Sequence, residues 1–305
     1  MKTYVDEDGR ISVALVENPY TGNTFGREFS ESPKILENGG LKERLSNLGC
    51  TLRNVSAVQL TPEEDKVFGN WNKMGYALGH LREIVAGNQR HGYFNIGLLG
   101  NCSSLTGMLA GLQQSDGLKP LKVGLVWIDS HGDFNTPETS LNGLLGGMPV
   151  AVAAGLCLTR LRLRAGLDPA LPTKYIVMGG LRTIYPYEQE LVDRSDIEFL
   201  STEDIQTLSK KIDDQMERLS RLTDVIYVHV DLDVLNPAEV PGFNFPEPGG
   251  PTSQELSAAL RKMFKYEKTA AFGVASTPYK DDKDGIAKNA AYRLIEGVVQ
   301  GVKER

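Results

Sequence analysis

The sequence predicts an α/β protein with three layers, in which helices cover both faces of a mostly parallel sheet of about eight strands. Strand-like and helix-like segments alternate along the whole 305-residue chain. Most of the strand-like segments are continuous apolar runs, which is typical of strands buried on both faces. Regular alternation of this kind favours parallel strands that are joined by helices.

The expected elements follow from these runs and from local start signals. We expect strands at 11–16, 51–60, 94–99, 122–128, 174–179, 197–200, 225–231 and 270–276. We expect helices near 31–48, 63–88, 103–115, 148–156, 186–194, 202–219, 252–266 and 284–303. Capping signals precede two of the helices, at Ser201 and at Thr252. Because no repeat, low-complexity tract or linker interrupts the pattern, we expect one domain over residues 1–305.

The composition is that of an ordinary soluble globular protein, with 41% hydrophobic and 24% charged residues. A net charge of -6 argues against a nucleic-acid partner. No apolar run is long enough to span a bilayer, and the first residues lack the apolar core of a signal peptide, so we expect no membrane partner and a cytoplasmic location. Three cysteines do not make a disulfide framework.

Two carboxylate-rich segments follow apolar runs and are the most informative feature of the chain. The first carries Asp129, His131 and Asp133, and the second carries Asp231 and Asp233. Residues two apart on an extended strand share a face, so these side chains can converge on one point. Gathered carboxylates repel unless a cation lies between them. We therefore expect all five residues to bind two divalent metal ions, with Asp129 and Asp231 as bridging ligands.

Cys102 is the expected sixth metal ligand. It lies in the segment Leu99-Gly-Asn-Cys102-Ser103, where another apolar run ends and a helix begins. A thiolate is favoured near a helix N-terminus, whereas a small buried thiol is the alternative interpretation. A thiolate ligand would shift the relative affinity of the site toward iron, cobalt or zinc and away from manganese.

Hydrolysis is the simplest reaction class for such a site. A hydroxide that bridges two metal ions is a ready nucleophile near neutral pH. The chain has no nucleophile elbow, no Walker loop and no dinucleotide fingerprint. The Gly-rich segments 134–147 and 241–251 follow the two motifs directly, so we interpret them as active-site loops.

The two motifs resemble the signatures of the arginase/agmatinase (ureohydrolase) family. Asp129-Ser-His131-Gly-Asp133-Phe-Asn135-Thr is similar to the first signature, and His229-Val-Asp231-Leu-Asp233-Val-Leu-Asn236-Pro237 is similar to the second. The resemblance covers most of the chain. It implies an arginase-like fold, a dinuclear manganese centre, hydrolysis of guanidino C–N bonds in a small-molecule substrate, and a homo-oligomer.

The chain departs from the family pattern at four places. A metal-binding His of the family aligns with Cys102, and the proton-shuttle His aligns with Gly146. The Asp that holds the substrate α-amine aligns with Tyr185, and the Glu that pairs with the guanidinium aligns with Ala275. The first two departures resemble the N-hydroxyarginine amidinohydrolase of cycloserine biosynthesis. Because a buried cation without its counter-charge is costly, we expect an amide, urea or hydroxyguanidine substrate in place of free arginine.

Further residues near the motifs are candidates for catalysis and substrate binding. We expect catalysis to involve Asp133 and Asn135, and substrate binding to involve Asn135, Glu138 and Tyr185. An Asx turn for Asn135, a solvated Glu138 and a packing role for Tyr185 are the alternatives. We expect His229 to point to the other face of its strand, as a core or supporting residue and not as a ligand.

The leading hypothesis is a metal-dependent hydrolase of a linear C–N bond, in an amidino, hydroxyguanidino or related group. One alternative is a catalytically degenerate arginase-like protein with a structural or regulatory role, which the lost His and Glu favour. Another is a deacetylase-like amide hydrolase with a single zinc ion. That class uses a His-His pair, which the chain lacks.

Overall fold

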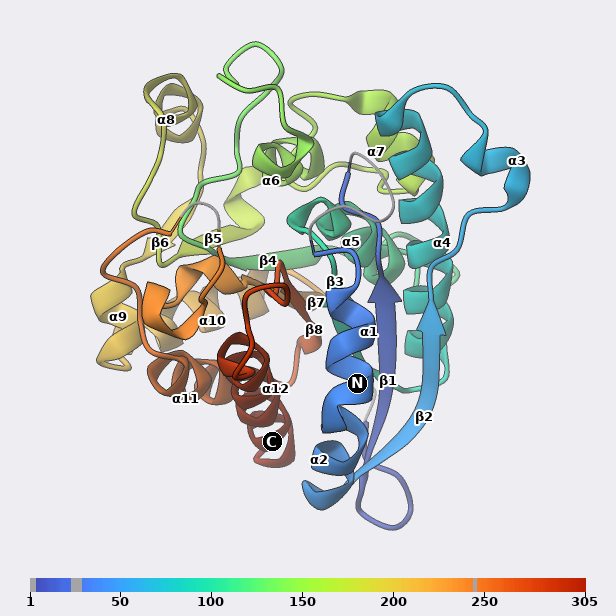
Figure 1. Cartoon of the computed structure of the whole chain (residues 1–305), viewed down its shortest axis with the longest axis vertical. Coiled ribbons are helices and arrows are strands. Elements are labelled where there is room, and N and C mark those ends of the chain that lie inside the picture. The colour runs from blue at the N-terminus through green and yellow to red at the C-terminus, as the bar shows by residue number, and fades with distance from the viewer. Residues whose placement is uncertain (1–3, 23–28, 244–245) are drawn as a thin grey trace.

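The protein, seen in a computed structural model that describes residues 4–22, 29–243 and 246–305, is built around one sheet of eight parallel strands (Figure 1). The strand order is β2-β1-β3-β8-β7-β4-β5-β6. The strands are β1 (Ile11–Asn18), β2 (Cys50–Ala57), β3 (Phe94–Leu99), β4 (Val123–Ile128), β5 (Ile176–Gly179), β6 (Glu198–Leu200), β7 (Val225–Asp231) and β8 (Thr269–Ala275). The expected fold class is therefore confirmed.

Helices flank the sheet in two packed groups, one containing α4, α5 and α7 and the other containing α9 to α12. In Figure 1, α1 and α12 lie in front of the strands, and α5 lies behind them. The helices are α1 (Ser32–Leu36), α2 (Lys42–Asn47), α3 (Pro62–Asp65), α4 (Asn70–Arg90), α5 (Leu105–Gln113), α6 (Pro149–Ala153), α7 (Thr159–Ala165), α8 (Pro186–Asp193), α9 (Thr202–Gln206), α10 (Lys210–Leu222), α11 (Ser253–Met263) and α12 (Ile286–Lys303).

Burial explains why the apolar runs became strands at the centre of the sheet. Every residue of β3, β4 and β8 is buried, as is all of β7 except Val225. The edge strands β2 and β6 keep exposed or half-buried positions. Strands covered on both faces need apolar side chains on both, which is the pattern that the sequence showed.

Three expected helices are interrupted where the backbone turns left-handed. In place of the expected helix 63–88 there are two helices, α3 and α4. The break between them ends at Gly69, whose φ is 93°. The expected helix 202–219 breaks near Leu208 at φ 54°, and the expected helix 31–48 contains a π-helical turn in which Gly40 has φ 106°. The helix α7 (Thr159–Ala165) was missed. Both predicted capping signals are present, at Ser201 and Thr252.

The four central strands β3, β8, β7 and β4 are consecutive neighbours, and their carboxyl ends meet at one edge of the sheet. In the register, Asp231 faces Ala275 and Val230 faces Ile128. Segments that follow these strands are therefore brought together, and ligands of open α/β sheets bind at this edge. None of the described helices combines the length and apolar character that crossing a membrane requires.

Candidate metal centre

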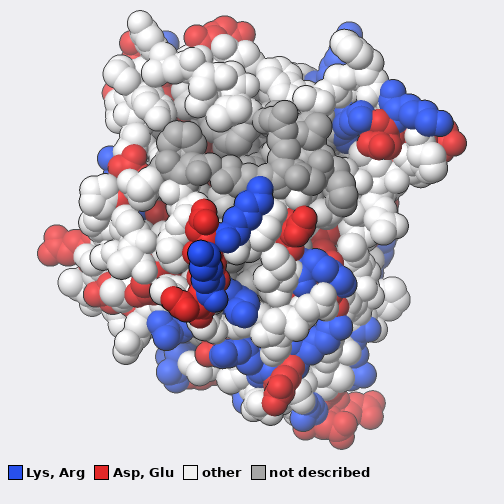
Figure 2. All heavy atoms as spheres, in the orientation of Figure 1, with Lys and Arg blue, Asp and Glu red and all other residues white. Residues whose placement is uncertain are grey.

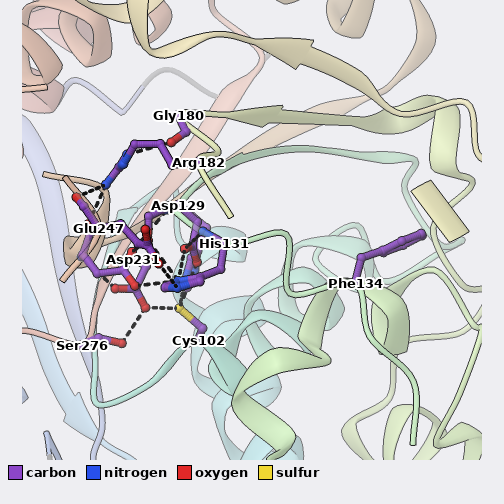
Figure 3. Close-up of polar contacts among 12 residues, drawn as sticks. Cys102, Asp129, His131, Phe134, Gly180, Arg182, Asp231, Glu247 and Ser276 are labelled. Atoms are coloured by element: carbon purple, nitrogen blue, oxygen red, sulfur yellow. Dashed lines mark hydrogen bonds and ion pairs between the residues drawn. The ribbon is translucent and has the colours of Figure 1, made fainter. Parts of the chain in front are cut away.

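The six expected metal ligands gather at the carboxyl ends of β3, β4 and β7. Cys102 lies in the short turn between β3 and α5, Asp129 directly follows β4, and Asp231 is the last residue of β7. Figure 3 shows Cys102, Asp129, His131 and Asp231 directed toward one another, whereas Phe134 points away from them.

Two groups of donor atoms share Asp129. The ligand atoms of Cys102, Asp129 and Asp133 lie within 4.8 Å of one another, and so do those of Asp129, His131 and Asp233. Asp231 belongs to neither group but lies beside the first one, with its Oδ2 2.7 Å from Cys102 Sγ. A carboxylate shared between two neighbouring donor groups is the arrangement that paired metal ions require.

The reason for this convergence differs from the one expected. The backbone does not stay extended through the first motif, because Asp133 has a left-handed φ of 48°. Asp129 Oδ1 accepts a 2.7 Å hydrogen bond from the backbone N–H of His131, and Asp231 Oδ1 accepts one of 3.0 Å from that of Asp233. These Asx turns fold each motif back on itself, so the turns, more than the strand pleat, bring the carboxylates together.

Burial and mutual repulsion dominate the electrostatics of the carboxylates. They raise the pKa of Asp129 and of Asp133 far above the ordinary value and that of Asp231 to about 7. Asp233 is the exception, because hydrogen bonds from His131 and Ser130 outweigh its burial and lower its pKa. Buried carboxylates of this kind are ionised together only beside a cation, and hard oxygen donors with one imidazole and one thiol suit a divalent transition metal.

The surroundings of Cys102 favour a protonated thiol when no cation is bound, against the expected effect of the helix N-terminus. Burial raises the pKa of this thiol well above its usual value, and the neighbouring Asp231, Asp129 and Asp133 raise it further. One short helical turn does not offset three nearby carboxylates. Cys102 can act as a thiolate ligand only when positive charge is close to its sulfur.

His131 lies on the open side of the cluster. Its Nδ1 lies 2.9 Å from Asp233 Oδ2 and its Nε2 lies 3.8 Å from Glu247 Oε1, while its side chain is 21% exposed. Although burial opposes it, hydrogen bonding to Asp129 and Asp233 raises the pKa of His131 to about 12. His131 and Asp133 are half-buried and the other expected ligands are buried, so a substrate would approach from their side.

Asn135 is buried but its polar atoms already have protein partners. Its Oδ1 accepts a 3.1 Å hydrogen bond from Thr139, its amide faces Glu188, and its backbone N–H donates to Gly147. This pattern fits the alternative of a loop-forming Asn as well as a catalytic one. Glu188 was missed by sequence reasoning.

The buried carboxylate of Glu188 fastens the loop that carries the candidate ligands His131 and Asp133 to α8. Its Oε1 accepts a 2.8 Å hydrogen bond from Phe134 N–H, and its Oε2 accepts a 3.2 Å bond from Tyr185 N–H. A Cβ atom on Gly132 would lie 2.6 Å from Glu188 Oε1, so a larger residue there would push the Glu188 carboxylate away from Phe134 N–H. A Glu at the third position of a helix that begins with Pro186 is the signal that could have revealed it.

Glu138 and Tyr185 are not brought into the cluster. Glu138 is exposed, and the group that its charge affects is the thiol of Cys157. The side chain of Tyr185 is 42% exposed at the start of α8. Neither contacts a carboxylate of the cluster among the residues that the structure describes.

Ser276 and Arg182 support the cluster and were also missed as functional residues. Ser276 Oγ donates a 2.6 Å hydrogen bond to Asp231 Oδ2, from a left-handed backbone at φ 58° (Figure 3). Arg182 donates to the backbone oxygens of Asp233 and Glu247, so it ties the second motif to the loop 241–251. Residues 244 and 245 of this expected active-site loop lie outside the described residues.

The expected direction of His229 is wrong. His229 and Asp231 are two residues apart on β7 and therefore share a face. The buried ring of His229 places Nε2 3.3 Å from Cys102 Sγ. The expectation that His229 is buried and supports the site, without being one of the gathered donors, agrees with this position.

The geometry agrees with the family that the sequence resembles. The model of the arginase family matches residues 13–300. The chain belongs to the arginase family. Proteins of this family are ureohydrolases, which use two metal ions to hydrolyse amidino C–N bonds.

Individual members of the arginase family resemble the chain over most of its length. The arginase of Bacillus subtilis (strain 168) is 27% identical over 302 residues, which cover 94% of this chain and 97% of the relative. A crystal structure of Bacillus subtilis arginase shares the fold with a TM-score of 0.83 at 24% identity and covers 94% of this chain and 98% of that one.

The same fold serves family members with other substrates in their names. Formimidoylglutamase of Bacillus subtilis has a TM-score of 0.73 at 16% identity, covering 99% of this chain and 92% of its own. Proclavaminate amidinohydrolase of Streptomyces clavuligerus has a TM-score of 0.68 at 21% identity, covering 96% and 92%. At these identities the likeness establishes the fold alone.

Proposed function

We propose that this chain is a metal-dependent hydrolase of a linear C–N bond whose substrate is less basic than free arginine. The observation that carries the proposal is the pair of buried donor groups that share Asp129. Six side chains with the right donor atoms meet at the edge of the sheet where α/β enzymes bind ligands. A structural protein has no need of such a costly gathering of buried carboxylates.

The proposed metal ligands are the six residues that the sequence indicated, with Asp129 and Asp231 as the bridging carboxylates. Manganese is the first candidate because the family uses it, and Cys102 makes iron, cobalt or zinc suitable as well. When bound, two such ions would lower the pKa of water and polarise the scissile group. The ligand set is Cys102, Asp129, His131, Asp133, Asp231 and Asp233.

The protein's own groups would position the reactants around these ions. Glu188 and Asn135 hold the loop that carries His131 and Asp133. Asp133 is half-buried while its carboxylate lies near the donor atoms of Cys102 and Asp129, so we propose Asp133 as the residue that contacts the substrate and receives a proton from the nucleophile. Asn135 is the proposed orienting residue beside it.

The substrate class follows from what surrounds the cluster. Ala275 stands where the family pattern has the Glu that pairs with a guanidinium, and the next residue, Ser276, bonds to Asp231. Tyr185 and Glu138 remain as proposed rim contacts, since both are exposed beyond the cluster. A hydroxyguanidine, as in the N-hydroxyarginine amidinohydrolase branch, is less basic than a guanidine, and an amide or urea is neutral, so each depends less on a buried counter-charge.

Metal content separates this proposal from its alternative, a degenerate relative with a structural or regulatory role. The loss of the shuttle His at Gly146 and of the Glu at Ala275 favours that alternative. We would measure bound metal by mass spectrometry in the wild type and in Cys102→His. We expect about two ions per wild-type chain, as in other two-metal sites. If the wild type contained no metal and Cys102→His bound it, the result would support the degenerate relative.

Turnover tests the catalytic part of the proposal. With hydroxyguanidines, ureas and amides as substrates, we expect Asp129→Ala to lower kcat by at least about 100-fold, because the bridging ligand is lost. The exposed Glu138 provides a matched control, and Glu138→Gln should change KM more than kcat. Wild-type turnover by the Asp129 variant would rule out a metal-dependent reaction at this site.

The remaining proposals concern the setting of the enzyme. We propose a small-molecule substrate, a homo-oligomer and a cytoplasmic location, by analogy with the family and from the composition. Acidic and basic side chains are interspersed on the face drawn in Figure 2, without one broad basic area. The proposal of no nucleic-acid partner rests on the net charge of -6.

A further inference from the structure

A buried row of hydrogen bonds leads from the sheet interior to Cys102. Tyr227 Oη lies 3.0 Å from His229 Nδ1, and His229 Nε2 lies 3.3 Å from Cys102 Sγ. Tyr227 and His229 are fully buried in β7, where residues two apart share a face. The two ring nitrogens of His229 thus have one partner each.

The neighbouring strands are shaped to hold this row. The indole of Trp127, paired with His229 in the register of β4 and β7, stacks on the imidazole with the ring centres 4.5 Å apart and the planes 6° from parallel. On the other side, Gly273 of β8 faces His229, and a Cβ atom there would lie 2.0 Å from Tyr227 Oη. A glycine is therefore needed for the hydroxyl to reach the ring.

The direction of the hydrogen bonds follows from the donor inventory. The hydrogen bonds of His229 run to a hydroxyl and to a sulfur, and a neutral imidazole carries one N–H. Within the described chain, the only hydrogen-bond partner of Tyr227 Oη is His229 Nδ1. A buried hydroxyl must donate somewhere, which makes Nδ1 the acceptor and leaves the proton on Nε2. That proton points at Cys102 Sγ.

We propose that Tyr227 and His229 are positioning residues that supply a fixed N–H···S hydrogen bond to Cys102 as a metal ligand. The inference rests on the proposed metal site. Hydrogen bonds from outside the ligand set orient ligands and tune their electron donation. Here the donor would withdraw electron density from a thiolate that already lies among three carboxylates, and would hold its sulfur beside Asp231 Oδ2.

Cobalt is a suitable probe, because a thiolate bound to Co²⁺ gives a sulfur-to-metal charge-transfer band. We would titrate the full-length protein with Co²⁺ and record band position and affinity for wild type, Tyr227→Phe, His229→Phe and the double variant. Phe at position 229 keeps a ring stacked on Trp127, and Phe at position 227 keeps a ring edge-on to residue 229. In the double variant both polar partners are replaced together, so no buried donor is left unpaired and folding is preserved.

We expect His229→Phe and the double variant to bind Co²⁺ about 10- to 100-fold more weakly, the usual effect of losing such a partner. Their band should move to longer wavelength, because sulfur without the N–H donor gives up electrons more easily. Tyr227→Phe should shift the band in the same direction but by less. Tyr292→Phe removes a buried hydroxyl that bonds to Leu36 far from the cluster, and should leave band and affinity unchanged.

The outcomes separate this inference from the proposed function. Cys102→Ser must abolish the band, which assigns it to this thiolate. A folded double variant with wild-type Co²⁺ affinity and an unshifted band would overturn the role of Tyr227 and His229 alone. A wild type that binds Co²⁺ without any charge-transfer band would overturn the thiolate ligand itself, and with it this part of the proposed metal site.

Discussion

At the scale of single residues, the candidate site depends on two side chains held in the left-handed backbone region. Asp133 and Ser276 both have positive φ, at 48° and 58°. Such conformations disfavour residues other than Gly, Asn and Asp, and they persist where the surrounding structure fixes them. Ser276 is the more costly of the two, and its hydroxyl bonds to a proposed bridging ligand.

Substitutions at Ser276 separate backbone strain from the hydroxyl. Ser276→Ala and Ser276→Gly both lose the bond to Asp231, but only Gly relieves the positive φ. After the extra chain entropy of Gly is counted, we expect Ala to be less stable than Gly by about 0.5–1 kcal/mol. Urea unfolding measures the difference. Equal stabilities would show that this backbone stores no strain.

Glu17 predicts a pH dependence of stability away from the cluster. Burial first, and then Glu37, raise the pKa of Glu17 to about 7. An acid with a raised pKa binds more protons in the folded state, so its contribution to stability falls as the pH rises from about 4.5 to about 7. Glu17→Gln has no carboxyl group to ionise, so it does not lose stability in this way as the pH rises. We expect the variant to gain stability relative to wild type at pH 8 and to gain less at pH 5, as measured by Tm.

Individual residues also mark where sequence reasoning stopped. All six proposed ligands could be found from the two motifs and one strand end, because residue type and spacing there are constrained by chemistry. Arg182 and Ser276 could not, since each acts through a contact that exists only after folding. Glu188 carries the signal of a helix start, but its bond to Phe134 N–H is a contact that only the fold reveals. Glu138 and Tyr185 were selected by position in a loop or an alignment, and position along the chain does not fix where a side chain points.

At the scale of elements, the strands were predicted correctly, but two helices were predicted to be continuous where the structure has a break. Buried parallel strands are visible in the sequence as apolar runs. All eight strands were therefore predicted, with ends that differ from the observed ends by a few residues. The expected helices 63–88 and 202–219 were joined across breaks, because helical periodicity continues on both sides of Gly69 and of Leu208. A left-handed residue such as Leu208 carries no sequence signal of its own.

The contact between β7 and β8 gives a prediction for Gly273. Gly273→Ala forces a Cβ against Tyr227 Oη, so we expect a cost of about 1–3 kcal/mol, the usual range for overpacking. Tyr227→Phe removes the clashing oxygen, and the double variant should be more stable than the sum of the two single changes implies. Urea unfolding of the wild type and of all three variants gives the free energy of coupling between the two substitutions. Strict additivity would show that the strands separate to absorb the clash.

At the scale of the whole molecule, bound metal would link distant parts of the chain. Its proposed ligands come from three strands, and one more strand contributes Ser276. Because the unfolded chain lacks this site, metal should stabilise the fold by mass action, by about 2.7 kcal/mol at a free concentration 100 times Kd. We expect Mn²⁺ to raise the Tm of wild type and not of Asp129→Asn. An equal rise in both would place the stabilising ion elsewhere.

One domain over residues 1–305 stays a prediction. The fold class was predictable from the sequence because alternation of apolar runs and helices has few packed solutions. The strand order was not, since nothing in an apolar run states which neighbour it will pair with.

The position of β8 has a consequence for how the protein is made. Every other strand is synthesised before β8, yet β8 lies between β3 and β7 in the finished sheet. Until residue 275 leaves the ribosome, the strands made earlier can form at most two separate half-sheets, β2-β1-β3 and β7-β4-β5-β6, each with an unpaired edge. The nascent chain is therefore most prone to aggregation late in translation, and we expect it to depend on chaperones that shield strand edges during that interval.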